Sequence, residues 1–523
     1  MSRTISFERY PGLSPLFLEF LRGLPDFYPD LPSVEAAISR GRGLLGTCPK
    51  IAADAFRYRR PEAAAMAEEL SAGRAVAVLV GHQVGLFTGP LFTVTKAFDA
   101  IRVARELKEA GVPAVPVFWA LTDDHDLEEI ARTARPADDG PQILVLEGAD
   151  RTSRQPVGGL PLPAGVGGVL DAFRADARGP WAEEILQAFA RRYSPGASYG
   201  DAFIEMLFDL VDPEPLLVLD PCAEKVRGPA SEFFLAAVER EKQVRETLRQ
   251  TADRLEREGK AVPVPFREGL FPFFTIDQGE RRRIEDLSAA AARVSRKESW
   301  PSTDVLTRPV LKSWLMPVAA SILGAAEIAY HAQALALFPV FGLPLPVLLP
   351  RSHLVLLGPR ERRAAEALAV GPEDLLSLPA RAGPEKTPET EEVSRIASAL
   401  DAGLAALEPR LADLDATLSA SLENVRRKIA HQLEQLSDRI RKAAERKDEI
   451  AWKRRRLLET MLLPQGTPAE RLYPPLVWML AYGRDALAAV RQAARGSTHG
   501  AAIVDLASES QARPDPKERS HAG

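Results

Sequence analysis

Four short apolar runs, separated by helical or loop segments, limit most strongly what this chain can fold into. They are AVAVLVG (75–81), VPAVPVFWAL (112–121), QILVLE (142–147) and PLLVLD (215–220). Near-continuous apolar strands that alternate with helices are typical of a parallel sheet covered on both faces. The fold class predicted is therefore α/β, and a later run, LPLPVLLPR (343–351), is expected to join the same sheet.

A different pattern begins near Pro388, where apolar residues step by three or four as far as about Leu463. This series predicts a coiled coil sustained over several heptads. Pro409 interrupts the series, and predicts either a kink or the start of a new helix. Its members are Val393, Ile396, Leu400, Leu404, Leu407, Leu411, Leu414, Leu418, Leu422, Val425, Ile429, Leu433, Leu436 and Ile440.

These patterns divide the chain into four parts. The predicted parts are an α/β core over residues 1–385 with a helical N-terminus, and a coiled-coil domain over 386–463. A C-terminal segment (464–510) is expected to return to the core, and residues 511–523 are expected to be disordered. Within the core, the stretch FREGLFPFFTIDQGERRRI (266–284) predicts a hairpin, because turn residues follow Asp277.

Charge and cysteine content exclude several classes of protein. The net charge of −5 argues against a general nucleic-acid or membrane-surface binder, which needs a basic excess. Two cysteines cannot form a disulfide framework, so a reducing cytoplasm is the expected compartment. We expect no signal peptide and no membrane-spanning helix.

The stretch GHQVGLFTGPLFTVTK (81–96) follows the first apolar run and leads into a helix. Gly85 permits a sharp turn, and Thr88 or Gly89 is expected to cap the helix. Free N–H groups of a first helical turn attract anions. We therefore predict a nucleotide or anion site that includes His82, Gln83, Gly85, Thr88, Gly89 and Lys96. A capped helix without any ligand is the alternative.

A second polar stretch, FWALTDDHDLEEI (118–130), ends the next apolar run. Ligands of open α/β sheets bind beyond the carboxyl ends of the strands, so we expect His125 and His82 to face one crevice. An adjacent carboxylate, Asp124 or Asp126, can orient His125 as a general base. The alternative is a simple helix cap. One histidine among aspartates is a weak metal signal, and no metal site is predicted.

The stretch GAAEIAYHAQALALF (324–338) predicts a helix on which Glu327 and Tyr330 share a face. His331 lies four residues after Glu327. These polar side chains among alanines indicate either a pocket wall or a solvent-exposed face.

Together these motifs resemble the bacillithiol biosynthesis cysteine-adding enzymes, the BshC family. The resemblance rests on GHQVGLFTGPLFTVTKA, VPVFWALTDDHDLEEI, EIAYHAQ, FGLPLPVLLPR and LLPQGTPAERLYPPLVWMLAYG, in that order. The chain departs from the family pattern at several positions. Lys312 and Ser313 stand where an amide or acid pair is usual, and His82 stands where glutamine is usual.

The resemblance implies a Rossmann-like core similar to class I nucleotidyl transferases, a coiled-coil arm and a homodimer. It implies a cytoplasmic ligase that adds cysteine to glucosaminyl-malate, the last step of bacillithiol biosynthesis. ATP or another nucleotide is the expected cofactor, with magnesium left open. Substrate contacts are expected at Trp119, Glu327, Tyr330 and Arg351. Two alternatives remain: another ATP-dependent nucleotidyl transferase or ligase, and a non-catalytic coiled-coil scaffold.

Overall fold

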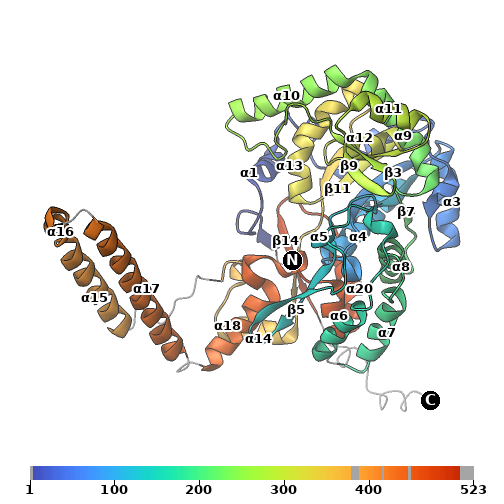
Figure 1. Cartoon of the computed structure of the whole chain (residues 1–523). Helices are drawn as coiled ribbons and strands as arrows, with labels where there is room; N and C mark the ends of the chain where they lie inside the picture. Colours follow the sequence, from blue (N-terminus) through green and yellow to red (C-terminus); the bar gives the residue numbers. More distant parts are fainter. Residues whose placement is uncertain (1–3, 178, 379–387, 415–416, 446–448, 507–523) are drawn as a thin grey trace, which may run out of the picture. The chain divides into compact units, whose positions relative to one another are not determined.

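A computed structural model describes residues 4–177, 179–378, 388–414, 417–445 and 449–506 (Figure 1). The chain forms two compact units. The first unit runs as far as Pro359 and resumes at Thr460, and the second comprises Arg360–Glu459. The structural division thus falls earlier than the boundaries at 385 and 463 expected from the sequence, because α14 (Pro359–Ala367) already belongs to the second unit.

A six-stranded sheet forms the centre of the first unit and confirms the α/β class. Its strand order is β12-β11-β3-β4-β7-β2. The strands are β2 (Phe56–Arg57), β3 (Val76–Gln83), β4 (Ala114–Leu121), β7 (Leu217–Leu219), β11 (Val318–Leu323) and β12 (Val347–Pro350). All neighbours are parallel except β2, which pairs antiparallel with β7 at one edge.

Two strand predictions are corrected by this sheet. The sequence VAASIL of β11 lies between β3 and β12, yet its small residues gave no strand signal. The run QILVLE lies instead in β6 (Gly140–Val145), which pairs antiparallel with β5 (Arg132–Ala137) outside the central sheet. There Ile143 and Val145 are exposed, so an apolar run was mistaken for a buried strand.

The predicted hairpin is confirmed. Strands β8 (Phe273–Asp277) and β9 (Glu280–Arg283) pair antiparallel, and β10 (Trp300–Thr303) completes a three-stranded sheet in the order β10-β8-β9. The turn uses Gln278 and Gly279, both in the left-handed region with φ of 49° and 83°. This small sheet brings Arg281 of β9 against Asp124 and His125, which follow β4.

Several helices pack against the strands of the central sheet. Helix α4 (Phe92–Glu109) packs against β3, β4 and β11, and α2 (Val34–Leu44) packs against β11 and β12. Helices α12 (Thr307–Leu315) and α13 (Ala325–Ala334) precede and follow β11. Further helices of this unit are α1 (Pro15–Arg22), α3 (Pro61–Ser71), α5 (Leu127–Ile130), α6 (Val166–Phe173), α7 (Ala182–Arg192), α8 (Tyr199–Val211), α9 (Glu224–Glu239), α10 (Glu241–Arg257) and α11 (Leu287–Ser295).

The C-terminal segment lies within the first unit. Helices α19 (Pro475–Tyr482) and α20 (Asp485–Ala493) are followed by β14 (Gly500–Asp505), which lies between β1 (Thr4–Ser6) and β13 (Leu354–Leu357). Trp478 and Tyr473 are almost fully buried. The segment therefore contributes to the core, while the tail predicted as disordered (511–523) lies outside the described residues.

The second unit is helical. Besides α14, its α-helices are α15 (Pro388–Ala405), α16 (Glu408–Leu414), α17 (Thr417–Glu445) and most of α18 (Glu449–Leu462), and α15 packs against α17. Pro409 lies at the start of α16, so it begins a new helix. Val393 and Leu422 are buried, whereas Leu400 is 43% exposed. Much of the apolar seam is therefore uncovered in the single chain.

No helix within the described ranges combines the length and the apolarity needed to cross a membrane.

Candidate functional site

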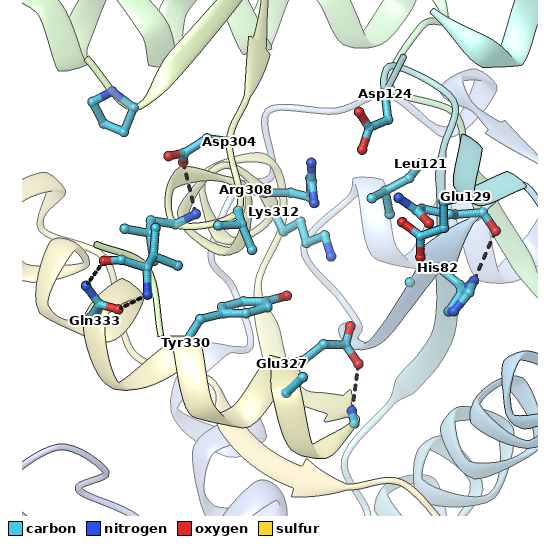
Figure 2. Close-up of a pocket in the computed structure, with 18 of the residues that line it drawn as sticks. His82, Leu121, Asp124, Glu129, Asp304, Arg308, Lys312, Glu327, Tyr330 and Gln333 are labelled. Atoms are coloured by element: carbon cyan, nitrogen blue, oxygen red, sulfur yellow. Dashed lines mark hydrogen bonds between the residues drawn. The ribbon is translucent and has the colours of Figure 1, made fainter. Parts of the chain in front are cut away.

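A large cavity opens beyond the carboxyl ends of β3, β4 and β11 (Figure 2). Its volume is about 690 Å³, and it is lined by Gly81 to Gln83, Leu121 and Gly324 from the three strand ends. This is where open α/β sheets bind their ligands. Helices α10, α12 and α13, residues 264–272 and the hairpin strands β8 and β9 supply most of the other lining residues.

Cationic side chains dominate the polar lining of this cavity. Nine arginines and lysines face four carboxylates, so an anionic or partly anionic ligand fits the cavity best. The cations are Lys96, Arg245, Arg267, Arg281, Arg283, Arg308, Lys312, Arg351 and Arg471, and the carboxylates are Asp124, Glu129, Asp304 and Glu327.

A buried ion pair joins α4 to α13 at the floor of the cavity. Lys96 Nζ lies 2.5 Å from Glu327 Oε2 and donates to the Gly81 carbonyl at 3.1 Å. The Lys96 side chain is 2% exposed and that of Glu327 is 26% exposed. Glu327 also accepts from the Gly324 N–H at 2.6 Å, which caps α13. Burial acts to raise the pKa of Glu327, but the charge of Lys96 brings it below its ordinary value.

A second buried pair fixes Arg351 at the cavity wall. Arg351 Nη1 lies 2.9 Å from Glu470 Oε1, and both side chains are almost fully enclosed. Glu470 also accepts from the Tyr10 hydroxyl at 2.6 Å and from the Leu354 N–H at 2.9 Å. Because Glu470 neutralises Arg351, this arginine is held in place by the protein, and its guanidinium faces the Phe92 ring at 4.6 Å.

Helices α12 and α13 direct a group of polar side chains into the cavity. Figure 2 shows Arg308 and Lys312 on one side of the cavity, with Tyr330 and Glu327 opposite them. Gln333 lines the cavity too, and its amide exchanges two hydrogen bonds with the backbone of Val264. These contacts make α13 a pocket wall, which decides between the two interpretations of its polar face.

Comparison with known proteins identifies the chain. The family described as "Bacillithiol biosynthesis BshC, N-terminal Rossmann-like domain" matches residues 52–352. The family described as "Bacillithiol biosynthesis BshC, C-terminal coiled-coil domain" matches residues 384–506. The chain belongs to the BshC family.

Several curated relatives in this family carry the name "Putative cysteine ligase BshC". One from Solibacter usitatus is 27% identical, and the match covers 92% of this chain and 91% of the relative. Another from Koribacter versatilis is 29% identical over 81% of this chain and 83% of the relative. A relative from Geobacillus thermodenitrificans is 27% identical, with 80% and 82% covered. The two family matches confirm the Rossmann-like and coiled-coil parts expected from the sequence.

Backbone N–H groups of the glycine-rich loop, which were expected to bind an anion, are engaged within the protein in this BshC chain. Leu86, Phe87 and Thr88 are fully buried, and the Phe87 ring packs against Tyr193 at 5.0 Å between centroids. The Thr88 N–H donates to the Tyr193 hydroxyl, and the Gly89 N–H to the Leu86 carbonyl, both at 2.8 Å. These N–H groups are therefore used inside the protein.

The helix after this loop also begins later than predicted. Helix α4 starts at Phe92, and the Leu91 N–H before it donates to the Tyr473 carbonyl at 2.8 Å. Gly85, Thr88 and Gly89 are not among the residues that line the cavity, and they position α4 and its Lys96 side chain. The apolar residues inside the loop, Leu86 and Phe87, were the signal that sequence analysis overlooked.

His82 and Gln83 do line the cavity, as predicted. His82 Nδ1 lies 3.1 Å from the Gln83 carbonyl, and its ring makes an edge contact with Phe92. Burial and the nearby charge of Lys96 lower the pKa of His82 to about 4. His82 is therefore a neutral imidazole near pH 7, suited to hydrogen bonding rather than to binding an anion by charge.

The geometry does not support His125 as the general base. His125 does not line the cavity, and its Nδ1 lies 3.0 Å from Arg281 Nη1. The same Nδ1 lies 3.5 Å from Asp124 Oδ1, so this ring nitrogen is engaged within the protein. Arg281 also donates to Asp124 at 3.2 Å. This network holds the small sheet, through Arg281 and Ser302 on β9 and β10, against the end of β4.

Three other residues predicted for this region, Asp126, Asp124 and Trp119, have different roles in the structure. Asp126 accepts from the Glu129 N–H at 3.2 Å as the N-cap of α5, which is the alternative stated for this stretch. Asp124 lines the cavity, but it is engaged by Arg281. Trp119, a predicted substrate contact, is fully buried behind the wall, and Lys312 lies 5.4 Å above its ring.

Of the two cations on α12, Lys312 was named only as a departure from the family pattern, and Arg308 was not predicted. Arg308 and Lys312 are four residues apart on that helix, so both can face the same side. The four-residue spacing is visible in TRPVLKSWLMP. It did not indicate a binding site, because β11, the strand that follows α12 in the central sheet, was not predicted. As for metals, the described residues contain no group of three or more His, Cys, Asp or Glu side chains arranged to hold an ion.

Proposed function

We propose that this protein is a cysteine ligase of bacillithiol biosynthesis that works in the cytoplasm. The reaction joins the carboxyl group of cysteine to the amino group of glucosaminyl-malate through an amide bond. The observation that carries the proposal is the family match over both parts of the chain, together with nearly full-length relatives named for this activity. The cavity at the strand ends, where open α/β sheets bind their ligands, supports the proposal.

Amide formation needs an activated carboxyl group, and we propose ATP as the activating substrate. Transfer of an adenylyl or phosphoryl group to the cysteine carboxylate releases pyrophosphate or ADP. The amine then attacks the acyl carbon, AMP or phosphate leaves with the bonding electrons, and the nitrogen loses a proton. Negative charge develops on phosphate and acyl oxygens in these steps, and preorganised cations stabilise it. The excess of cations in the cavity supports this assignment.

The test is reconstitution with purified protein, cysteine, glucosaminyl-malate and ATP, with mass spectrometry of the thiol product and of the nucleotide. We expect product only when all three substrates are present, and AMP or ADP identifies the activation step. Serine in place of cysteine is the matched substrate control. Nucleotide turnover without cysteine transfer would favour a different nucleotidyl transferase, and no response to any substrate would favour the scaffold.

We also propose that two copies associate through the second unit. Ile396, Leu400, Val425 and Leu436 are each about 43–44% exposed on α15 and α17. A continuous apolar seam of this kind is seldom left open to water, and symmetric pairing of two copies covers it. Within the unit, Arg426 on α17 pairs with Asp401 on α15 at 2.9 Å, which fixes the two helices side by side.

Analytical ultracentrifugation tests the dimer. Leu400→Glu combined with Val425→Glu should convert a dimer to a monomer, because charges then lie on the seam. Ser398→Glu, at an exposed polar position on α15, is the matched control and should leave the dimer intact. A wild-type protein that sediments as a monomer would refute this part of the proposal.

A further inference from the structure

Two cations on α12, Arg308 and Lys312, lack a carboxylate partner. Four other cations of the cavity have one: Lys96, Arg245, Arg281 and Arg351. Among the described residues, no carboxylate lies within ion-pair distance of Arg308 or Lys312. Their nearest acidic neighbours are already engaged. Glu327 is paired with Lys96, and Asp304 accepts from the backbone N–H groups of Leu306 and Thr307 at the start of α12.

The surroundings of the pair leave room for the cations. An added methyl group at Gly81 would lie 3.3 Å from Lys312 Nζ, so the glycine creates the space that the ammonium occupies. Behind Lys312 is the Trp119 ring, at 5.4 Å. The Nε of Arg308 is buried and has no hydrogen-bond partner among the described residues. An unpartnered buried donor is costly, and such groups in native proteins call for an explanation.

We propose that Arg308 and Lys312 form a subsite for an anionic group of the substrate, a carboxylate or a phosphate. Two neighbouring cations repel each other until an anion lies between them. A guanidinium presents two parallel N–H groups to a carboxylate or phosphate, and an ammonium adds a point charge. Tyr330, which lies opposite the pair in Figure 2, closes the subsite from α13. The subsite rests on this geometry; its assignment to a ligase substrate rests on the proposed function.

The charge state of Lys312 gives the subsite a pH signature. Burial, and then the charge of Arg308, lower the pKa of Lys312 to about 7. A bound anion favours the protonated amine, so binding takes up a proton above pH 7 and weakens as the pH rises. The other groups that act on Lys312 are Glu327, Lys96 and Asp123, while Tyr330 and His331 line the adjoining face of α13. Burial raises the pKa of Tyr330 and lowers that of His331 to about 4, so neither titrates between pH 6 and 9.

Calorimetry with two simple probes, malate and inorganic pyrophosphate, tests the subsite without requiring turnover. Lys312→Met and Arg308→Met should each weaken binding of at least one probe by roughly 10- to 100-fold, the typical effect of losing a charge-assisted hydrogen bond. Lys108→Met, at an exposed position on α4 outside the cavity, is the matched control and should bind as wild type does. The probe that depends on the pair identifies the source of the anion, carboxylate or phosphate.

Wild-type protein provides a second readout that does not depend on the folding of a variant. Malate is a dianion throughout pH 6–9, and its affinity should fall by up to about tenfold per pH unit above pH 7. Lys312→Arg keeps the charge but does not titrate in this range, so it should remove the fall. Failure of wild type to bind either probe at millimolar concentration would overturn the subsite. So would equal binding by wild type and both methionine variants. Binding that does not change between pH 6 and 9 would overturn the lowered pKa of Lys312. A ligase that turns over while these variants bind normally would separate failure of the subsite from failure of the function.

Discussion

The Lys96–Glu327 pair provides the sharpest test of how the cavity floor is held together. Lys96→Met keeps most of the side-chain volume and removes the charge, which leaves Glu327 without its cation. Breaking a buried pair in this way typically costs about 3–5 kcal/mol. The Glu327 side chain is 26% exposed and keeps its bond to the Gly324 N–H, so the lower end of that range, about 3 kcal/mol, applies here.

Calorimetry should show this loss as a lower melting temperature. The unfolding entropy is about 2.1 cal/mol/K per residue, or about 0.9 kcal/mol/K for a first unit of roughly 420 residues. A loss of about 3 kcal/mol therefore lowers the melting temperature of that unit by about 3 °C. Combining Lys96→Met with Glu327→Gln should recover part of the loss, because the unpaired charge is then absent.

The contrary result is equally specific. If Lys96→Met melts like wild type but binds anionic ligands far more weakly, Lys96 serves the ligand and not the fold. An additive double variant would likewise show that the two groups do not interact in solution, and the structural explanation of the cavity floor would then be wrong.

Three further predictions follow from the same region. His125→Asn should change the rate of cysteine addition by less than about threefold. Loss of a general base would instead lower the rate by about 100- to 10,000-fold. Rates measured per folded molecule distinguish the two outcomes. Asp124→Asn should make the free energy of unfolding less dependent on pH at acid pH. Burial acts to raise the pKa of Asp124, but its contacts with His125 and Arg281 hold that pKa below the ordinary value. Its stabilisation is therefore present above about pH 4 and is lost as the pH falls, which chemical denaturation at pH 2–7 measures. Gly81→Ala should weaken malate or pyrophosphate binding by calorimetry, because its methyl group would lie 3.0 Å from the Trp119 carbonyl oxygen and 3.3 Å from Lys312 Nζ. Gly43→Ala, with nothing within 4 Å, should not.

The sequence predicted the parts of the fold that have strong local signals. Strands β3 and β4 are continuous apolar runs, and both lie in the centre of the sheet. Strand β11 was missed because VAASIL is short and rich in small residues, and its strand character comes from its neighbours β3 and β12. The run at β6 was misassigned because an apolar composition does not reveal whether a strand is buried.

The candidate site was predictable where position along a strand was enough. His82 and Gln83 line the cavity because they end β3, and Glu327 and Tyr330 line it because they share a face of α13. The partner of Lys96 was not predictable, since Glu327 is 231 residues away in the chain. The loop at Gly85 to Gly89 misled because glycines indicate a turn but do not show whether its N–H groups face a ligand or the protein interior.

The central claim, cysteine addition in bacillithiol biosynthesis, is tested most directly by measuring low-molecular-weight thiols in cells with and without this protein. Thiols are labelled, separated and quantified by mass spectrometry, together with glucosaminyl-malate. We predict that cells without the protein lack bacillithiol and accumulate glucosaminyl-malate, and that the wild-type gene restores the thiol. Unchanged bacillithiol in the deleted strain, with no accumulation of the precursor, would contradict the assignment.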